Sequence, residues 1–155
     1  MRATKTVSSL ASLRKIAGPR AAELPQIARL EMIARLIEEE CAAEVAWAVA
    51  YGALFERLSH GLSADAPLPR GRFEVLVVTT LDNIYDAAVA LGERVFAPVR
   101  WEYGKGIEYH IWTVEEFEYA VRENHPIWRR ITAASVSIYG APDAAAAKYA
   151  KPGLS

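Results

Sequence analysis

Two glutamates within predicted strands are the residues whose types and spacing could carry chemistry. Glu74 is the one charge in the apolar run 73–79, and Glu108 lies two residues before His110 in the alternating run 107–112. Side chains two residues apart point to the same face of a strand, so the two carboxylates meet if these strands are neighbours. Paired carboxylates at one end of a sheet suit Mg²⁺ or Mn²⁺, which take oxygen ligands and hold substrate phosphates.

A purely structural role for Glu74 is the alternative. Arg72 and Lys105 are basic residues that could form an ion pair with this carboxylate near the strand end. Structural ion pairs occupy such positions as well as functional ones do. The residue types alone therefore leave a metal site and an ion pair both open.

Several familiar sites have no matching residues in this chain. It lacks the Gly-x-x-x-x-Gly-Lys-Ser/Thr loop that cradles phosphates, and its Gly-Lys-Gly at 104–106 lacks the downstream glycine of a dinucleotide-binding turn. Its three histidines have no cysteine or histidine at the close spacing of a structural zinc site. A phosphate loop and a structural zinc are thus not expected.

Composition indicates a single globular domain in a reducing compartment. The chain has 155 residues, is 52% hydrophobic and carries a net charge of −1, which gives no overall field to gather nucleic acid or an anionic membrane. Its one cysteine, Cys41, cannot form an internal disulfide, so we expect a small core residue and a cytoplasmic location. The longest apolar stretch, 45–54, is far shorter than the roughly 20 residues of a membrane span. No membrane association is expected.

Hydrophobic periodicity predicts intermixed helices and strands. The predicted helices cover 21–41, 53–58 and 84–95, and a further helix begins at Val114 behind a Thr-Val-Glu-Glu capping box. Pro126 either interrupts that helix or begins a new one. The predicted strands are 45–51, 73–79, 99–103, 107–112 and 136–140, of which 99–103 and 107–112 could form a hairpin around 104–106. In the strand 45–51 large side chains alternate with alanines, so one face can accept a closely packed helix.

These elements predict an α/β (α+β) fold, with a mixed sheet of four or five strands packed against three or four helices. Residues 1–20 carry five basic and no acidic side chains, and we expect a flexible, solvated N-terminus there. A transit peptide and a nucleic-acid-binding arm are the alternatives for that segment. The domain itself is expected to span 21–140, and 141–155 to form a tail or a short helix.

The order of these elements resembles the minimal nucleotidyltransferases of the DNA polymerase β superfamily. The resemblance rests on a strand that ends in Gly52-Ala53, on Gly-Arg-Phe-Glu-Val-Leu-Val-Val at 71–78, on the strand and helix start at 107–118, and on the closing helix and strand at 125–140. In that family the first strand ends in Gly-Ser, the second carries Asp-x-Asp and the third carries another aspartate. The resemblance covers about 22–140 and implies a nucleotidyltransferase-like fold.

The resemblance assigns a role to five positions. Gly52 matches the glycine that holds the triphosphate, but Ala53 stands where the family has serine and offers no hydroxyl. Arg72 falls on the first aspartate, Glu74 on the second and Glu108 on the third. The family's three carboxylates bind two Mg²⁺ ions, so an arginine here would remove one ligand and much of the attraction for the ions. Arginine forms forked bonds to carboxylates, and Arg72 could therefore lie between the two glutamates in the metal's place.

Three hypotheses follow from the resemblance. In the first, the protein has lost two-metal catalysis and binds an ATP-like nucleotide, an RNA end or a protein partner. The partner could be the HEPN-type helical protein of a toxin–antitoxin pair, with this chain as the antitoxin-like half. In the second, it is an active Mg²⁺-dependent enzyme that transfers a nucleoside monophosphate from a nucleoside triphosphate to a protein or nucleic-acid hydroxyl, with Glu74 and Glu108 as catalytic metal ligands and a third from Glu102 or Asp65. In the third, only the fold is shared. A second copy of the chain is a further candidate partner.

Overall fold

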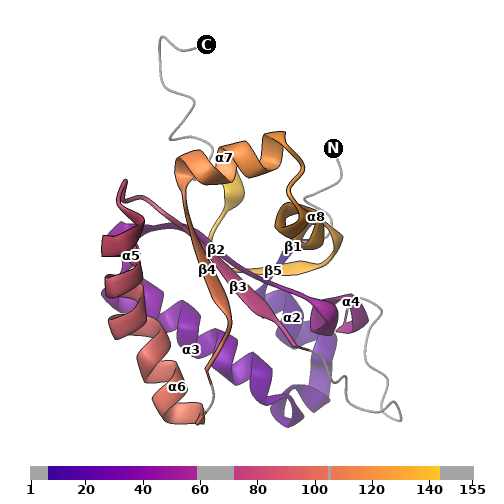
Figure 1. Ribbon diagram of the computed structural model, residues 1–155. Coiled ribbons are helices and arrows are strands. Elements are labelled where there is room, and N and C mark those ends of the chain that lie inside the picture. The colour runs from indigo at the N-terminus through magenta and orange to yellow at the C-terminus, as the bar shows by residue number, and fades with distance from the viewer. Residues whose placement is uncertain (1–6, 59–71, 105, 144–155) are drawn as a thin grey trace.

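Five strands form one mixed sheet at the centre of the protein, which confirms the predicted fold class (Figure 1). The computed structural model describes residues 7–58, 72–104 and 106–143. Its strands are β1 (Val7–Ser9), β2 (Val45–Tyr51), β3 (Glu74–Thr79), β4 (Tyr109–Thr113) and β5 (Ser135–Gly140), in the order β1-β5-β2-β3-β4. β2 is antiparallel to both β3 and β5, whereas β4 is parallel to β3 and β1 is parallel to β5.

The described residues contain seven α-helices, more than the three or four expected. They are α2 (Leu10–Ala17), α3 (Pro25–Glu40), α4 (Ala53–Leu58), α5 (Ile84–Leu91), α6 (Ala97–Tyr103), α7 (Val114–Arg122) and α8 (Pro126–Ala133). A π-helical turn, η3 (Gly92–Phe96), joins α5 to α6, and two 3₁₀ turns, η1 (Gly18–Glu23) and η2 (Ala42–Glu44), flank α3. No helix in these ranges is long and apolar enough to span a membrane.

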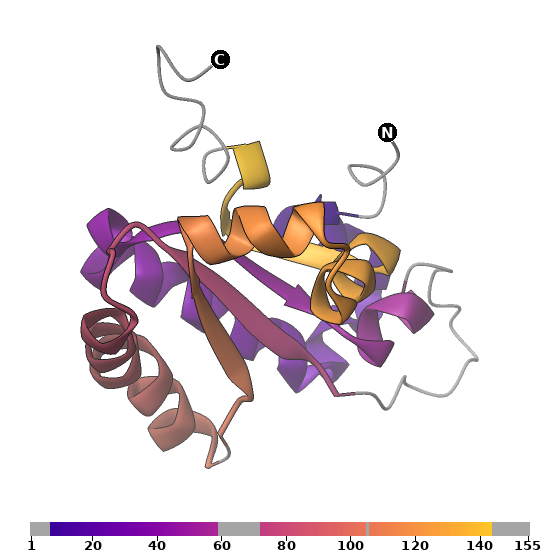
Figure 2. The ribbon, with the colours of Figure 1, turned by 45° about the horizontal axis from the view of Figure 1, so that its top comes forward.

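Helices cover both faces of the sheet, as Figure 2 shows, with α7 and α8 on one side and α2 and α3 on the other. The alternation of large residues and alanines in β2 explains how a helical layer packs against each face of the sheet. Ala48 and Ala50 pack in the larger core with α3, whereas Trp47 and Tyr51 pack in the smaller core with α7 and α8. All seven residues of β2 are buried, so this strand carries the centre of both cores.

The capping box and the buried cysteine are confirmed. Thr113 accepts a hydrogen bond from the Glu116 backbone, and the Glu116 carboxylate accepts one from the Thr113 backbone, which starts α7 at Val114. Pro126 is the first residue of α8 and therefore begins a new helix. Cys41 is fully buried in the larger core.

The predicted strand at 99–103 and its hairpin are wrong, because these residues form α6. Val95, Val99 and Tyr103 recur every four residues and pack against the larger core, which is a helical pattern. Trp101, which a strand at 99–103 would place on the same face as Val99 and Tyr103, is 91% exposed. Gly104 ends the helix with φ of +71°, a left-handed conformation typical of a helix C-terminus.

The N-terminal segment adds two elements that the sequence analysis did not predict. Residues 7–9 form the edge strand β1, and Ser9 caps α2 by accepting a hydrogen bond from the Ser12 backbone. Leu13 and Ala17, four residues apart, are buried against the domain, while Arg14 pairs with Glu31 of α3 at 2.6 Å. The basic side chain at 14 thus faces outward from an amphipathic helix. Residues 59–71 and the part of the predicted tail beyond Asp143 lie outside the described residues.

Candidate functional site

The predicted site residues come together at one end of three neighbouring strands. β2 ends at Tyr51, opposite Glu74 at the start of the antiparallel β3. β4 runs parallel to β3 with Tyr109 beside Val75, and the Val75 backbone donates a hydrogen bond of 3.0 Å to the Glu108 carbonyl. The predicted condition for the carboxylates to meet, that their strands are neighbours, is therefore confirmed.

Gly52 occupies a position that excludes any side chain. Its φ is +133°, and a Cβ atom there would lie 2.8 Å from the carbonyl oxygen of Arg72. The close approach joins the end of β2 to the entry of β3, while Ala53 begins α4 directly after it. The backbone therefore requires glycine at position 52, whether or not this residue also contacts a ligand.

Glu74 makes three side-chain contacts, and both of its carboxylate oxygens take part. Tyr51 Oη donates to Oε1 at 3.1 Å, and His110 Nε2 lies 3.2 Å from the same oxygen. Arg130 Nη2, from α8, donates to Oε2 at 3.1 Å. We call these four residues, Tyr51, Glu74, His110 and Arg130, the Glu74 cluster.

The electrostatics of the cluster favour an ionised Glu74. Burial raises the pKa of Glu74, but the hydrogen bonds from His110, Arg130 and Tyr51 together outweigh burial and leave that pKa below its usual value. Burial, and then the neighbouring Glu74 carboxylate, raises the pKa of Tyr51, which keeps the phenol a hydrogen-bond donor. The Arg130 guanidinium lies 5.0 Å from the Tyr51 ring centroid, within range of a cation–π contact.

The cation beside Glu74 is Arg130 rather than the predicted Arg72 or Lys105. Within the described ranges, Arg72 forms no ion pair with Glu74 or Glu108, and Lys105 lies outside these ranges. The ion pair, one of the two alternatives left open for Glu74, is therefore present, with a partner other than the two suggested. Sequence analysis could not identify Arg130, because nothing in the local pattern showed that α8 packs over this end of the sheet.

The donor set does not fit a two-metal site. No group of three His, Cys, Asp or Glu side chains among the described residues could hold an ion. Glu74 is committed to three donors, and Glu102, one of the suggested third ligands, is an exposed residue of α6. Asp65, the other, lies outside the described ranges. Mg²⁺ binds through several oxygens at nearly ideal geometry, which one exposed carboxylate at Glu108 does not supply.

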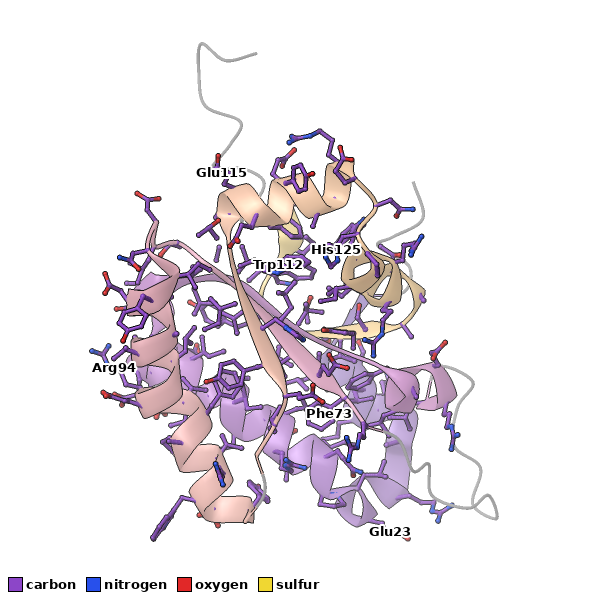
Figure 3. The ribbon with its side chains drawn as sticks, viewed as in Figure 1. Glu23, Phe73, Arg94, Trp112, Glu115 and His125 are labelled. Atoms are coloured by element: carbon purple, nitrogen blue, oxygen red, sulfur yellow. The ribbon has the colours of Figure 1, made fainter. Side chains whose placement is uncertain are left out.

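A pocket of about 330 Å³ lies at the same end of the sheet but on the α3 side, whereas the Glu74 cluster lies on the α8 side. It contains two of the predicted site residues, Arg72 and Glu108, together with residues from the start of α3 and the entries to β3 and β4. The lining residues are Gln26, Arg29, Arg72, Phe73, Gly106, Ile107 and Glu108. Figure 3 labels Phe73 where the chain enters β3, between this end of the sheet and α3. Sequence analysis missed Gln26 and Arg29, because both read as polar positions on the outer face of an amphipathic helix.

Comparisons with known proteins return no relative. No family model, no curated protein and no solved structure matches this chain.

Proposed function

We propose that this protein is a nucleotide-binding module without two-metal nucleotidyl transfer, and that an ATP-like nucleotide binds at the end of β2, β3 and β4 beside Gly52, Ala53 and Arg72. The observation that carries the proposal is the engagement of Glu74. Both carboxylate oxygens accept hydrogen bonds from protein donors, one of them the permanently charged Arg130. A carboxylate held in this way is a poor ligand for Mg²⁺.

The charges at this end of the sheet support the binding of an anionic ligand without a metal ion. Arg29 and Arg72 line the pocket with one glutamate, Glu108, so one positive charge remains among the lining residues, whereas Arg130 is paired with Glu74 outside the pocket. Arginine is the residue best suited to phosphate, since its fork of donors matches the phosphate oxygens. Phosphate binding here would need no bridging cation.

An active nucleotidyltransferase is the alternative function for this site. It would require Glu74 to leave Arg130, Tyr51 and His110 and to bind an ion, which breaks three contacts of a partly buried carboxylate. An antitoxin-like role with a HEPN-type helical partner is the hypothesis to pursue if no nucleotide binds.

Calorimetric titration with ATP in the presence of EDTA tests the proposal. We expect wild-type protein to bind, Arg72→Gln to bind several-fold more weakly, and Arg122→Gln to bind as wild type does. Arg122→Gln is a matched control because it removes the same charge from the exposed end of α7, away from this site. Absence of ATP binding in EDTA would overturn the proposal, as would transfer of labelled nucleotide that depends on Glu74.

A further inference from the structure

Arg29 is a partly buried cation without an acidic partner. Its Nη2 donates to the Gly106 carbonyl at 3.3 Å, and its guanidinium lies 5.7 Å from the Phe73 ring centroid. Its Nε is buried and has no hydrogen-bond partner, and within the described ranges Arg29 forms no ion pair. Burial lowers the pKa of Arg29, which reflects the cost of keeping this charge away from water. An anion in the pocket would offset that cost.

Gln26 supplies an unused acceptor in the same pocket. It lies three residues before Arg29 on α3, a spacing that places both side chains on one side of the helix. Its Oε1 is buried and accepts no hydrogen bond from any described residue. Buried polar atoms are nearly always paired in native proteins, and a ligand that carries both an acceptor and a donor would pair with these two atoms, one donor and one acceptor, of residues that line a single pocket.

The remaining lining residues add one group of each kind. Arg72 is a second guanidinium, and the Glu108 carboxylate is an acceptor for hydroxyl or amino donors. A volume of about 330 Å³ lies at the lower end of the range for small-molecule pockets. It suits a sugar phosphate better than a whole nucleoside triphosphate.

We propose that this pocket binds the sugar-phosphate part of the ligand, with the phosphate between Arg29 and Arg72 and with Gln26 and Glu108 accepting hydrogen bonds from sugar hydroxyls. The inference deepens the proposed function and rests on it for the identity of the ligand as a nucleotide. It assigns binding roles to two α3 residues, Gln26 and Arg29, that lie outside the strand motifs.

Titrations with AMP and with ribose 5-phosphate, both in EDTA, test the assignment. Arg29→Gln should weaken both by about tenfold or more, because it removes a charge-assisted hydrogen bond to phosphate. Arg35→Gln is the matched control: it removes the same charge from α3, but at an exposed arginine whose ion pair with Glu39 lies away from the pocket. The control should bind both ligands within about twofold of wild type, the effect of a distant exposed charge.

A second variant keeps the test valid if Arg29→Gln folds poorly. Gln26→Glu preserves size and adds a negative charge beside the phosphate, and should weaken both ligands several-fold while its thermal unfolding stays close to that of wild type. Unchanged affinity for AMP and ribose 5-phosphate in both variants would overturn the assignment.

The two ligands separate this inference from the proposed function. Arg29-dependent binding of ribose 5-phosphate by a protein that binds no nucleotide supports the sugar-phosphate pocket and overturns the nucleotide function. Nucleotide binding that is sensitive to Arg72→Gln but indifferent to Arg29→Gln supports the nucleotide function and overturns the pocket. Absence of binding by AMP, ATP and ribose 5-phosphate overturns both.

Discussion

Arg130 on α8 binds the Glu74 carboxylate at the first position of β3, with Nη2 3.1 Å from Oε2. This contact joins the helical layer formed by α7 and α8 to the end of the sheet where the predicted site lies. It also gives the Glu74 carboxylate a protein cation as its partner.

Glu74→Gln is expected to destabilise the protein by about 1–3 kcal/mol near pH 7, the typical cost of losing hydrogen bonds to a charged group. The pKa of Glu74 is lowered in the folded state, so its ionised form stabilises the fold above the ordinary value of 4.5. That contribution is lost as the pH falls below 4.5 and through the lowered pKa. Urea denaturation of wild type and variant over this range should show their free energies of unfolding converging in acid.

Glu108→Gln is the matched control for that measurement. It removes the same charge from the neighbouring strand, at an exposed residue outside the Glu74 cluster. Its effect on stability at pH 7 should stay within about 0.5 kcal/mol, as for most surface substitutions. A Glu74→Gln effect no larger than that of Glu108→Gln would show that the cluster adds no stability.

Gly52→Ala should cost more stability than Gly104→Ala, although both glycines have positive φ. At Gly104 a Cβ atom meets nothing within 4 Å, so only the left-handed conformation is penalised, by about 1–2 kcal/mol. At Gly52 the same atom would also lie 2.8 Å from the Arg72 carbonyl and force β3 away from β2. Thermal unfolding of the two variants measures the difference, and equal melting temperatures would contradict the close approach.

Thr113→Ala should destabilise the protein by about 1 kcal/mol, because the Glu116 backbone amide loses its acceptor at the start of α7. Thr113→Ser keeps the hydroxyl and should recover most of that loss. Denaturant unfolding of the three proteins tests this. A serine variant as unstable as the alanine variant would mean that the threonine methyl, rather than the cap, is what matters.

Local pattern predicted most of the sheet and the placement of the site. The alternation of large residues and alanines in β2, the apolar run of β3 and the capping box before α7 each depend on neighbours within a few residues, and all three are confirmed. The strand predicted at 99–103 failed because Val99, Trp101 and Tyr103 fit a period of two over so short a stretch. The four-residue spacing that indicates a helix becomes visible only when Val95 is considered together with Val99 and Tyr103.

The contacts within the site were beyond prediction from a single sequence. Arg130 lies 56 residues from Glu74, and Gln26 and Arg29 reach the pocket only because α3 packs under the entries to β3 and β4. Side-chain partners at such separations depend on tertiary packing, for which a local sequence pattern carries no signal. Arg72, suggested as one possible partner of Glu74, is the basic residue nearest to it in the sequence, whereas Arg130 is the arginine that the fold brings into contact with it.

The central claim is that the Glu74 carboxylate contacts Arg130, Tyr51 and His110 and does not bind a metal ion. The most direct measurement is an ATP titration of wild type and Glu74→Gln, each with Mg²⁺ and with EDTA, after circular dichroism has confirmed that the variant is folded. The account predicts that wild type binds ATP equally well in Mg²⁺ and in EDTA, and that Glu74→Gln shows the same indifference to Mg²⁺. ATP binding that requires Mg²⁺ in wild type and disappears in Glu74→Gln would contradict the account and identify Glu74 as a metal ligand.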